Sequence, residues 1–287
     1  GAIYAYLGTL NLDGVLLDGN TASQQGGGMY LLGTGRLTIA NSTIQGNTAG
    51  DVGGGLVVFD RNIVLNDVEA INNTSSYNGG FLVASNGSFS GSHLNVRGNQ
   101  VTNNGGGAGM YLYDVDANIV NSVLAGNDVP SAIIIAPSAI YYHSTGAAQL
   151  FLRYVTIAAN TGGGVGAVSG ITGPVSTDAV ISAYNDVSQV REGATTTMYR
   201  TLLYASPPAD PLQNAQTSFN AGIGNISDSP MFVGDASGSD PSASPNINAF
   251  DFHLQNASPA VDADNTGAVD ADGSTADLGA YGGPNGA

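Results

Sequence analysis

Six oxygen-bearing side chains near the C-terminal end of the sequence could bind a cation: Asp262, Asp264, Asn265, Asp270, Asp272 and Asp277. Calcium is bound by several hard oxygen ligands on a flexible loop. The spacing Asp262-x-Asp264-x-Thr266-Gly267 follows the first positions of an EF-hand loop, but the twelfth position is Gly273 and not a bidentate glutamate. The same carboxylates could instead cap turns by hydrogen bonding to nearby backbone N–H groups. Calcium is therefore the one cofactor that the sequence suggests.

Two further groups of side chains have chemistry that carbohydrate-active enzymes use. Asp114 and Asp116 alternate along one expected strand, and a glycosidase needs two placed carboxylates; a solvated surface pair is the alternative. A lyase needs a base and a group that neutralises charge, which these residues could supply: Tyr142, His143, Arg153 and Tyr154. Neither group carries a signature of pectin-active enzymes. We therefore assign no catalytic residue and favour a protein without enzymatic activity.

Four tyrosines could bind a glycan, because an aromatic ring offers a flat apolar face with a polar end. These candidates for stacking on sugar rings are Tyr111, Tyr113, Tyr141 and Tyr142. A glycan-binding module would use them to hold its ligand without turnover.

The composition excludes several classes of function. The formal net charge is −16, and all six basic residues are arginines. Binding of nucleic acid or of an anionic membrane needs clustered basic residues, which are missing here. No apolar run is long enough to span a membrane, and the absence of cysteine rules out disulfides and thiolate metal sites.

An internal repeat indicates the elements that must position these side chains. Its markers are spaced by 27, 26, 26, 28 and 33 residues: Asn20, Asn47, Asn73, Asn99, Asn127 and Asn160. The positions three, eight and ten residues before each marker are almost always apolar, and a glycine cluster with a third apolar run follows it. Positions two apart point to the same face of a strand, so each copy contains three short strands. Stacked copies bury a core that no single copy can bury.

These strands predict an all-β fold, a single right-handed parallel β-helix with about 26–28 residues per coil. We expect the marker asparagines to adopt a left-handed backbone at a turn and to stack their amides into a ladder. Coils should extend over residues 1–204, with an insertion near 129–150. Residues 205–287, rich in Pro, Ser, Asp and Asn in their first part, should form a loop-rich C-terminal cap.

Two resemblances refine this interpretation. The repeat over about residues 1–165 is similar to chlamydial polymorphic outer-membrane protein repeats, which carry a Gly-Gly-Ala-Ile and a Phe-x-x-Asn element in each coil. Gly1-Ala2-Ile3 matches the first element, and Leu17-Asp18-Gly19-Asn20 matches the second with leucine in place of phenylalanine. Residues 222–283 resemble the C-terminal region of bacterial β-helix proteins of the choice-of-anchor kind. Four blocks in order carry this second resemblance: residues 224–233, 251–254, 258–262 and 270–283.

The resemblances imply a secreted or cell-surface bacterial protein. We expect a structural or adhesive role, as a filament or surface-layer subunit whose copies stack head to tail to cover an open strand edge. Glycans and other surface proteins are the other expected partners. The alternatives are a polysaccharide lyase or hydrolase and a glycan-binding module, since a β-helix fold alone does not fix the function.

Overall fold

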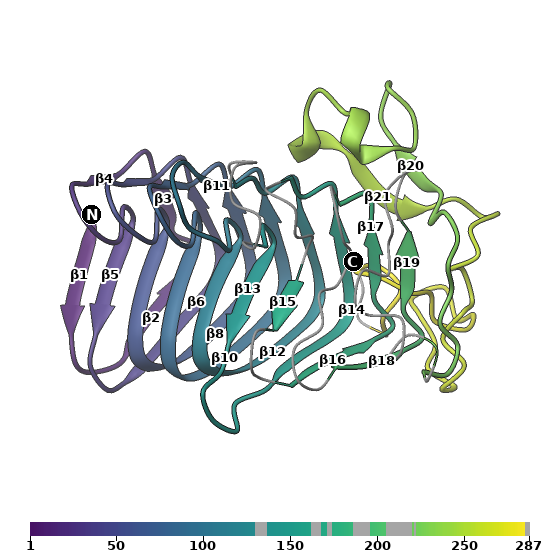
Figure 1. Ribbon diagram of the computed structural model, residues 1–287, viewed down its shortest axis with the longest axis horizontal. Coiled ribbons are helices and arrows are strands. Elements are labelled where there is room, and N and C mark those ends of the chain that lie inside the picture. The colour runs from purple at the N-terminus through teal and green to yellow at the C-terminus, as the bar shows by residue number, and fades with distance from the viewer. Residues whose placement is uncertain are drawn as a thin grey trace.

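The computed structural model describes residues 1–129, 137–161, 168–170, 174–185, 196–204, 220 and 222–284. Over these residues the chain is a right-handed parallel β-helix of about six turns, as expected, and a loop-rich C-terminal region (residues 222–284) lies at one end of it (Figure 1). Residues 130–136 of the predicted insertion and 205–219 of the predicted loops lie outside the described residues.

Most strands belong to one sheet that winds around the solenoid. The strands along its main path are β1 (Ile3–Tyr6), β5 (Met29–Leu32), β8 (Leu56–Ile71), β10 (Leu82–Arg97), β12 (Met110–Ala125), β14 (Leu150–Ala158), β16 (Val175–Asp178) and β18 (Thr196–Tyr199). The strands beside this path are β2 (Leu10–Asp13), β3 (Leu16–Asp18), β6 (Arg36–Gln45), β13 (Ile140–His143), β15 (Val168–Gly170), β17 (Ile181–Ala183) and β19 (Leu202–Tyr204).

The remaining elements are short. A second parallel sheet contains β4 (Thr21–Ala22), β7 (Thr48–Ala49), β9 (Thr74–Ser75) and β11 (Gln100–Val101). The C-terminal region holds an antiparallel pair and two 3₁₀ turns: β20 (Phe232–Gly234), β21 (Asp251–Leu254), η1 (Pro241–Ala243) and η2 (Ile247–Ala249). Among the described residues, no helix has the length and apolar character to cross a membrane.

The coils stack in strict register. Ile3 pairs with Met29, Met29 with Leu56, Leu56 with Leu82, and Leu82 with Met110, so one coil takes 26 to 28 residues. Side chains that alternate along each strand point inward and form columns of the buried core. The column ten residues before the marker asparagines contains Leu37, Ile63, Phe89, Ala117 and Leu150.

Asparagines at one turn of every coil form a continuous hydrogen-bonded ladder. The Nδ2 of each asparagine donates to the Oδ1 of the next one along the solenoid, at 2.8–3.0 Å. The ladder runs through Asn20, Asn47, Asn73, Asn99, Asn127 and Asn160, and it continues to Asn185, which the repeat spacing did not single out. From Asn47 onward these side chains are buried.

The prediction that the ladder asparagines have a left-handed backbone is wrong by one residue. The positive φ angles belong to the residues just before them, such as Gly46 (φ 61°) and Asn72 (φ 55°). A residue in this conformation turns the chain sharply and is most often glycine or asparagine. The following asparagine does not have a positive φ, and its amide points toward its neighbours in the ladder.

A second column of left-handed residues lies six positions before the ladder. These residues, called here the corner column, are Gly14, Asn41, Asp67, His93, Asn121 and Tyr154, with φ between 47° and 63°. Asparagine, aspartate and histidine are the non-glycine residues that tolerate this conformation best. The corner column bends β6, β8, β10, β12 and β14, and its members Asn41, Asp67, His93 and Asn121 carry polar side chains on successive coils.

The outer face between the corner column and the ladder is polar at Thr43, Glu69 and Asn95 and mostly apolar from Val123 onward. Four residues before each ladder asparagine stand Leu16, Thr43, Glu69, Asn95, Val123, Thr156 and Ile181. The C-terminal region packs Phe232, Phe252 and Leu278 against the apolar end of this face, around Val123 and Ile181. The polar side chains of the earlier coils therefore remain uncovered.

Candidate functional site

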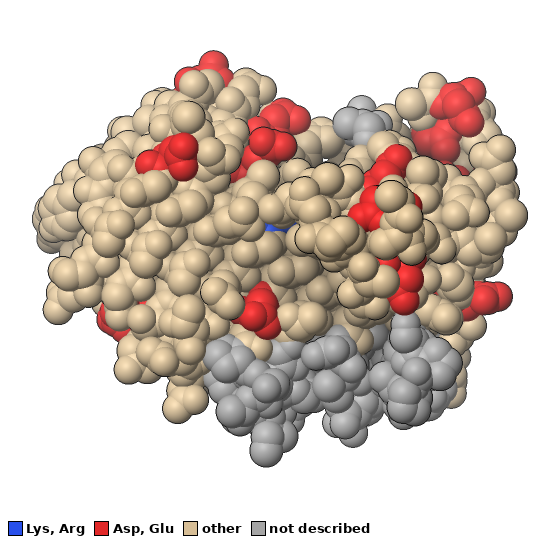
Figure 2. Space-filling model, turned by 90° about the horizontal axis from the view of Figure 1, so that it is seen from above, with Lys and Arg blue, Asp and Glu red and all other residues tan. Residues whose placement is uncertain are grey.

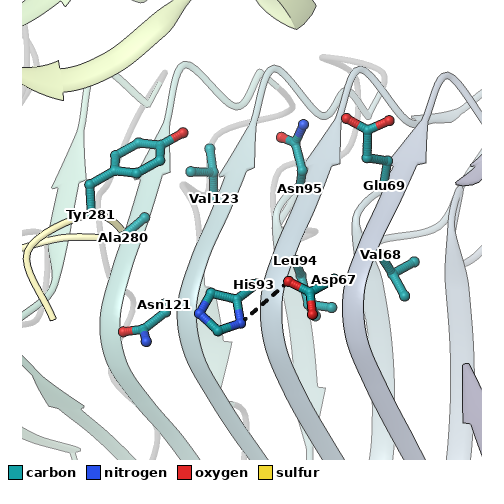
Figure 3. Close-up of a pocket in the computed structure, with 10 residues that line it drawn as sticks. All are labelled: Asp67, Val68, Glu69, His93, Leu94, Asn95, Asn121, Val123, Ala280 and Tyr281. Carbon is teal, nitrogen blue, oxygen red and sulfur yellow. Dashed lines mark ion pairs between the residues drawn. The ribbon is translucent and has the colours of Figure 1, made fainter. Parts of the chain in front are cut away.

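A groove lies where the uncovered outer face of the solenoid meets the C-terminal region. Its volume is about 300 Å³, at the lower end of the roughly 300–1,000 Å³ that small-ligand sites occupy. Its lining residues are Asp67, Val68, Glu69, His93, Leu94, Asn95, Asn121, Val123, Ala280 and Tyr281 (Figure 3). The groove is thus built by three consecutive coils and one segment that is distant in sequence.

Two parallel rows of side chains form the groove (Figure 3). The first, called here the corner row, contains Asp67, His93 and Asn121 from β8, β10 and β12. The second, called the strand row, contains Glu69, Asn95 and Val123 two residues further along the same strands. Each row advances by one side chain per coil, about 4.8 Å, so the groove offers repeated polar contacts along the solenoid axis.

The corner row concentrates groups that form hydrogen bonds. His93 Nδ1 lies 3.6 Å from Asp67 Oδ1, and the Asp67 carboxylate is exposed. Asn121 Oδ1 is buried and accepts no hydrogen bond from the described residues. An unsatisfied buried acceptor is uncommon in native proteins, so the row has an acceptor that the described residues leave unused.

Tyr281 adds an aromatic ring to the end of the groove. Its ring stacks on the His253 ring, with centroids 4.0 Å apart and planes 19° apart, and Asp251 Oδ1 lies 2.6 Å from His253 Nδ1. Burial raises the pKa of the Tyr281 phenol, and Arg97 partly offsets that effect. The stacking contact with His253 therefore holds the Tyr281 ring in the groove without a ligand.

Arg97 joins the solenoid to the C-terminal region beside this groove. Its buried guanidinium donates to the carbonyl oxygens of Ile247 and Phe250, at 3.2 and 2.9 Å, and lies 4.9 Å from the centre of the Phe252 ring. Its Nε also donates to Asn95 of the strand row. Burial lowers the pKa of Arg97, while Tyr281 and the carboxylates of Glu69 and Asp251 oppose this shift.

Replacing Arg97 by methionine is expected to weaken the attachment of the C-terminal region by about 2 kcal/mol, because the carbonyls of Ile247 and Phe250 lose a charged donor while apolar contacts persist. Hydrogen exchange of β21 measures this loss, and Arg36→Met is the matched control. Arg36 is exposed, so its replacement should change stability by less than about 0.5 kcal/mol. Equal protection of β21 in the two variants would contradict the role assigned to Arg97.

One calcium candidate, Asp264, belongs to a buried charge network. Its Oδ2 accepts a hydrogen bond from the Tyr154 hydroxyl, its Oδ1 lies 3.2 Å from Arg200 Nε, and its side chain is fully buried. Arg200 also contacts Asp178. Burial alone raises the pKa of Asp264, but hydrogen bonds from Tyr154 and Thr266 and the charge of Arg200 outweigh it and lower the pKa. This carboxylate therefore already has its charge partner.

The other calcium candidates lie on turns of the same region. Asp277 accepts a hydrogen bond from the backbone N–H of Asp262, at 2.7 Å. Burial raises the pKa of Asp277, and the carboxylates of Asp270, Asp262 and Asp272 contribute to the shift, so these groups are neighbours. Asn265 is exposed. Within the described part of the chain, no three His, Cys, Asp or Glu side chains are arranged to hold a metal ion, and calcium binding stays a prediction.

The proposed stacking tyrosines differ in their exposure. Tyr142 is fully buried in the core, and burial raises its pKa to about 12, so its assignment as a sugar platform is wrong. Tyr111 and Tyr141 pair in register, and their rings stack 4.9 Å apart at 15°. The rings of Tyr113 and His143 lie 5.0 Å apart and are tilted by 31°. Rings stacked along the axis turn their faces toward each other, which leaves mainly their edges for a ligand.

Asp114 and Asp116 hold the turn that follows β13. The Asp114 carboxylate accepts hydrogen bonds from the hydroxyl and the backbone N–H of Thr145, at 2.7 and 2.6 Å, and these bonds lower its pKa. Asp116 accepts a hydrogen bond from the backbone N–H of Gln149 at 3.0 Å. Both carboxylates therefore have structural partners.

The lyase candidates have separate partners. The His143 ring lies 5.0 Å from the Tyr113 ring, Tyr154 donates to Asp264, and Arg153 Nε lies 3.5 Å from Asp178. Tyr142 and Tyr154 are buried, so the four side chains do not face one exposed site.

Sequence reasoning missed the groove, although the repeat contains a signal for it. Counting six and four residues back from Asn73, Asn99 and Asn127 gives the corner row and the strand row. The contribution of Tyr281 has no such signal, because a contact between β10 and a segment almost 200 residues later depends on tertiary packing.

The comparisons with known proteins agree with this architecture. A family model described as the right handed beta helix region matches residues 2–161. No curated protein and no solved structure shows significant similarity to the chain. The resemblances to polymorphic outer-membrane repeats and to choice-of-anchor proteins stay predictions. Since the family model covers more than half of the sequence, the chain belongs to the right-handed β-helix family.

Proposed function

We propose that the chain is the β-helix of a secreted or cell-surface bacterial protein, with an adhesive role that it performs by binding a glycan in the groove. One observation carries the proposal: two rows of polar side chains advance with the coil spacing beside a fixed aromatic ring (Figure 3). A pyranose unit in an extended glycan has a length comparable to this spacing. Consecutive sugars can therefore meet equivalent positions on consecutive coils.

The chemistry of the lining supports a sugar ligand. Carboxylate, amide and imidazole groups form hydrogen bonds with hydroxyl groups, and Asp67, Asn95, His93 and Asn121 supply them. Tyr281 supplies a ring beside them. Carbohydrate recognition combines such polar contacts with an apolar surface, and the groove holds both within about 300 Å³.

Replacing Tyr281 by alanine is expected to weaken glycan binding by about two- to tenfold, since an aromatic contact contributes roughly 0.5–1.5 kcal/mol. A glycan array identifies the ligand, and titration calorimetry measures its affinity for the full chain. Tyr77→Ala is the matched control, because Tyr77 is exposed and lies outside the groove. Unchanged binding by Tyr281→Ala, or no binding to any glycan, would contradict the proposal.

The same experiment addresses the enzymatic alternative. Right-handed β-helix domains occur both in surface proteins and in polysaccharide-active enzymes, and the close approach of Asp67 and His93 in the groove is the observation that favours turnover. New reducing ends or unsaturated products in the incubated glycan would assign a hydrolase or a lyase. A bound glycan that is recovered intact supports the adhesive role.

A further inference from the structure

The charge of the groove indicates which glycans it can select. Asp67 stands on the corner row and Glu69 on the strand row, and both carboxylates are exposed. The nearest guanidinium, Arg97, is buried and donates to three backbone carbonyls of the C-terminal region. Asp251 adds a third carboxylate near Arg97. Carboxylates therefore outnumber guanidinium groups around the groove.

The exposed charged groups that line the groove are hydrogen-bond acceptors. Ionised Asp67 and Glu69 accept hydrogen bonds only, and Asn121 Oδ1 is a buried acceptor without a partner among the described residues. The Asn95 Oδ1 already accepts a hydrogen bond from Arg97. A ligand with several N–H donors should therefore bind here with the highest affinity. A charged donor forms stronger hydrogen bonds to a carboxylate than a neutral one does.

The aromatic ring and the overall charge favour the same ligand. The face of an aromatic ring attracts a cation, and Tyr281 lines the groove close to the two rows (Figure 3). The chain has a formal net charge of −16 and no lysine, and acidic residues are spread over the face in Figure 2, with almost no basic surface visible. This field attracts cations and repels acidic polysaccharides.

We propose that the groove selects glycans that carry free amino groups, such as glucosamine oligomers, over their acetylated or acidic counterparts. The inference rests on the proposed glycan-binding function and specifies its ligand class. Glu69 and Asp67 share one coil on β8, so the ammonium group of the sugar above that coil forms charged hydrogen bonds with both carboxylates. An acetamido group has one neutral N–H and lacks this charge, and a uronic acid places its own carboxylate beside two others.

The test is a calorimetric titration of the full chain with three hexasaccharides: glucosamine, N-acetylglucosamine and galacturonic acid oligomers, at a pH where the amines are charged. The glucosamine oligomer should bind at least tenfold more tightly than the acetylated one, and its affinity should fall as salt is added. Glu69→Gln and Asp67→Asn should each weaken glucosamine binding by about three- to tenfold. Asp60→Asn is the control, because Asp60 is an exposed acid of β8 outside the groove and should leave the affinity unchanged.

Each outcome separates this inference from the function on which it rests. Equal binding of acetylated and amino oligomers would overturn the selectivity and leave glycan binding standing. Tighter binding of the galacturonic acid oligomer would overturn it as well. Failure of all three oligomers and of a glycan array would overturn both. Binding of oligolysine without binding of the glucosamine oligomer would show that the groove takes a basic peptide, which also contradicts the proposal.

Discussion

Replacing Asn99 by alanine is expected to lower the free energy of unfolding by about 4 kcal/mol, since several buried polar groups lose their partners at once and each costs roughly 1–3 kcal/mol. Asn99 Nδ2 donates to the Ala70 carbonyl at 2.9 Å, and its Oδ1 accepts from both the backbone N–H and the Nδ2 of Asn73. Asn127 loses a donor on the other side. Chemical unfolding followed by circular dichroism measures the loss.

The end of the ladder provides a matched control for Asn99. Asn20 donates to Asn47 only and is half-buried, so Asn20→Ala should cost about 1 kcal/mol. The isosteric Asn99→Asp keeps the acceptor for Asn73 but removes the donor, and it should be at least as harmful as alanine because it buries a charge. Equal losses for Asn20→Ala and Asn99→Ala would show that the central hydrogen bonds add nothing.

The coil register could be predicted because each coil depends only on its immediate neighbours. Apolar residues at fixed distances before Asn47, Asn73 and Asn99 specify the strands. The left-handed turn was placed one residue too late, because glycine and asparagine stand side by side at Gly46-Asn47 and both residues suit that conformation. Asn185 was not recognised as part of the ladder, since the spacing from Asn160 is only 25 residues and the flanking pattern is weaker.

The repeat spacing indicates the two rows of the candidate site, but the segment that completes it could not be predicted, because it depends on contacts between distant parts of the chain. Glu69, Asn95 and Val123 occupy equivalent positions in three coils, and the change to an apolar residue marks the edge of the face that the C-terminal region covers. Sequence alone does not show which segment covers that face. The contacts of Arg97 with Ile247 and Phe250 join segments about 150 residues apart, and no local pattern reports them.

The buried network around Asp264 is expected to have a comparably large effect. Asp264→Ala should weaken the packing of the C-terminal region by about 3–5 kcal/mol, because removing one partner of a buried ion pair leaves the other charge uncompensated. Arg200 keeps Asp178 but loses Asp264, and the Tyr154 hydroxyl loses its acceptor. Hydrogen exchange of β21 and thermal unfolding report this loss.

The pH dependence separates the charge of Asp264 from its packing. Because its pKa is lower in the folded protein, this carboxylate stabilises the fold at pH values above its unfolded pKa of about 3.9. That contribution disappears as the pH falls through the lower folded pKa. Asp264→Asn keeps the shape of the side chain but removes its ionisable group. The free energy of unfolding of this variant should therefore change less than that of the natural protein between about pH 5 and 2.

Asp262→Asn is the matched control, because Asp262 is an exposed acid two residues away. It should keep both the stability of the natural protein at neutral pH and its acid sensitivity. If Asp264→Asn instead lost stability with acid as steeply as the natural protein, other carboxylates would have to account for the acid response. If Asp264→Asn were as stable as the natural protein at neutral pH, Asp178 alone would suffice as the charge partner of Arg200. The attachment of the C-terminal region would then depend on Arg97 and on the aromatic cluster around Phe252.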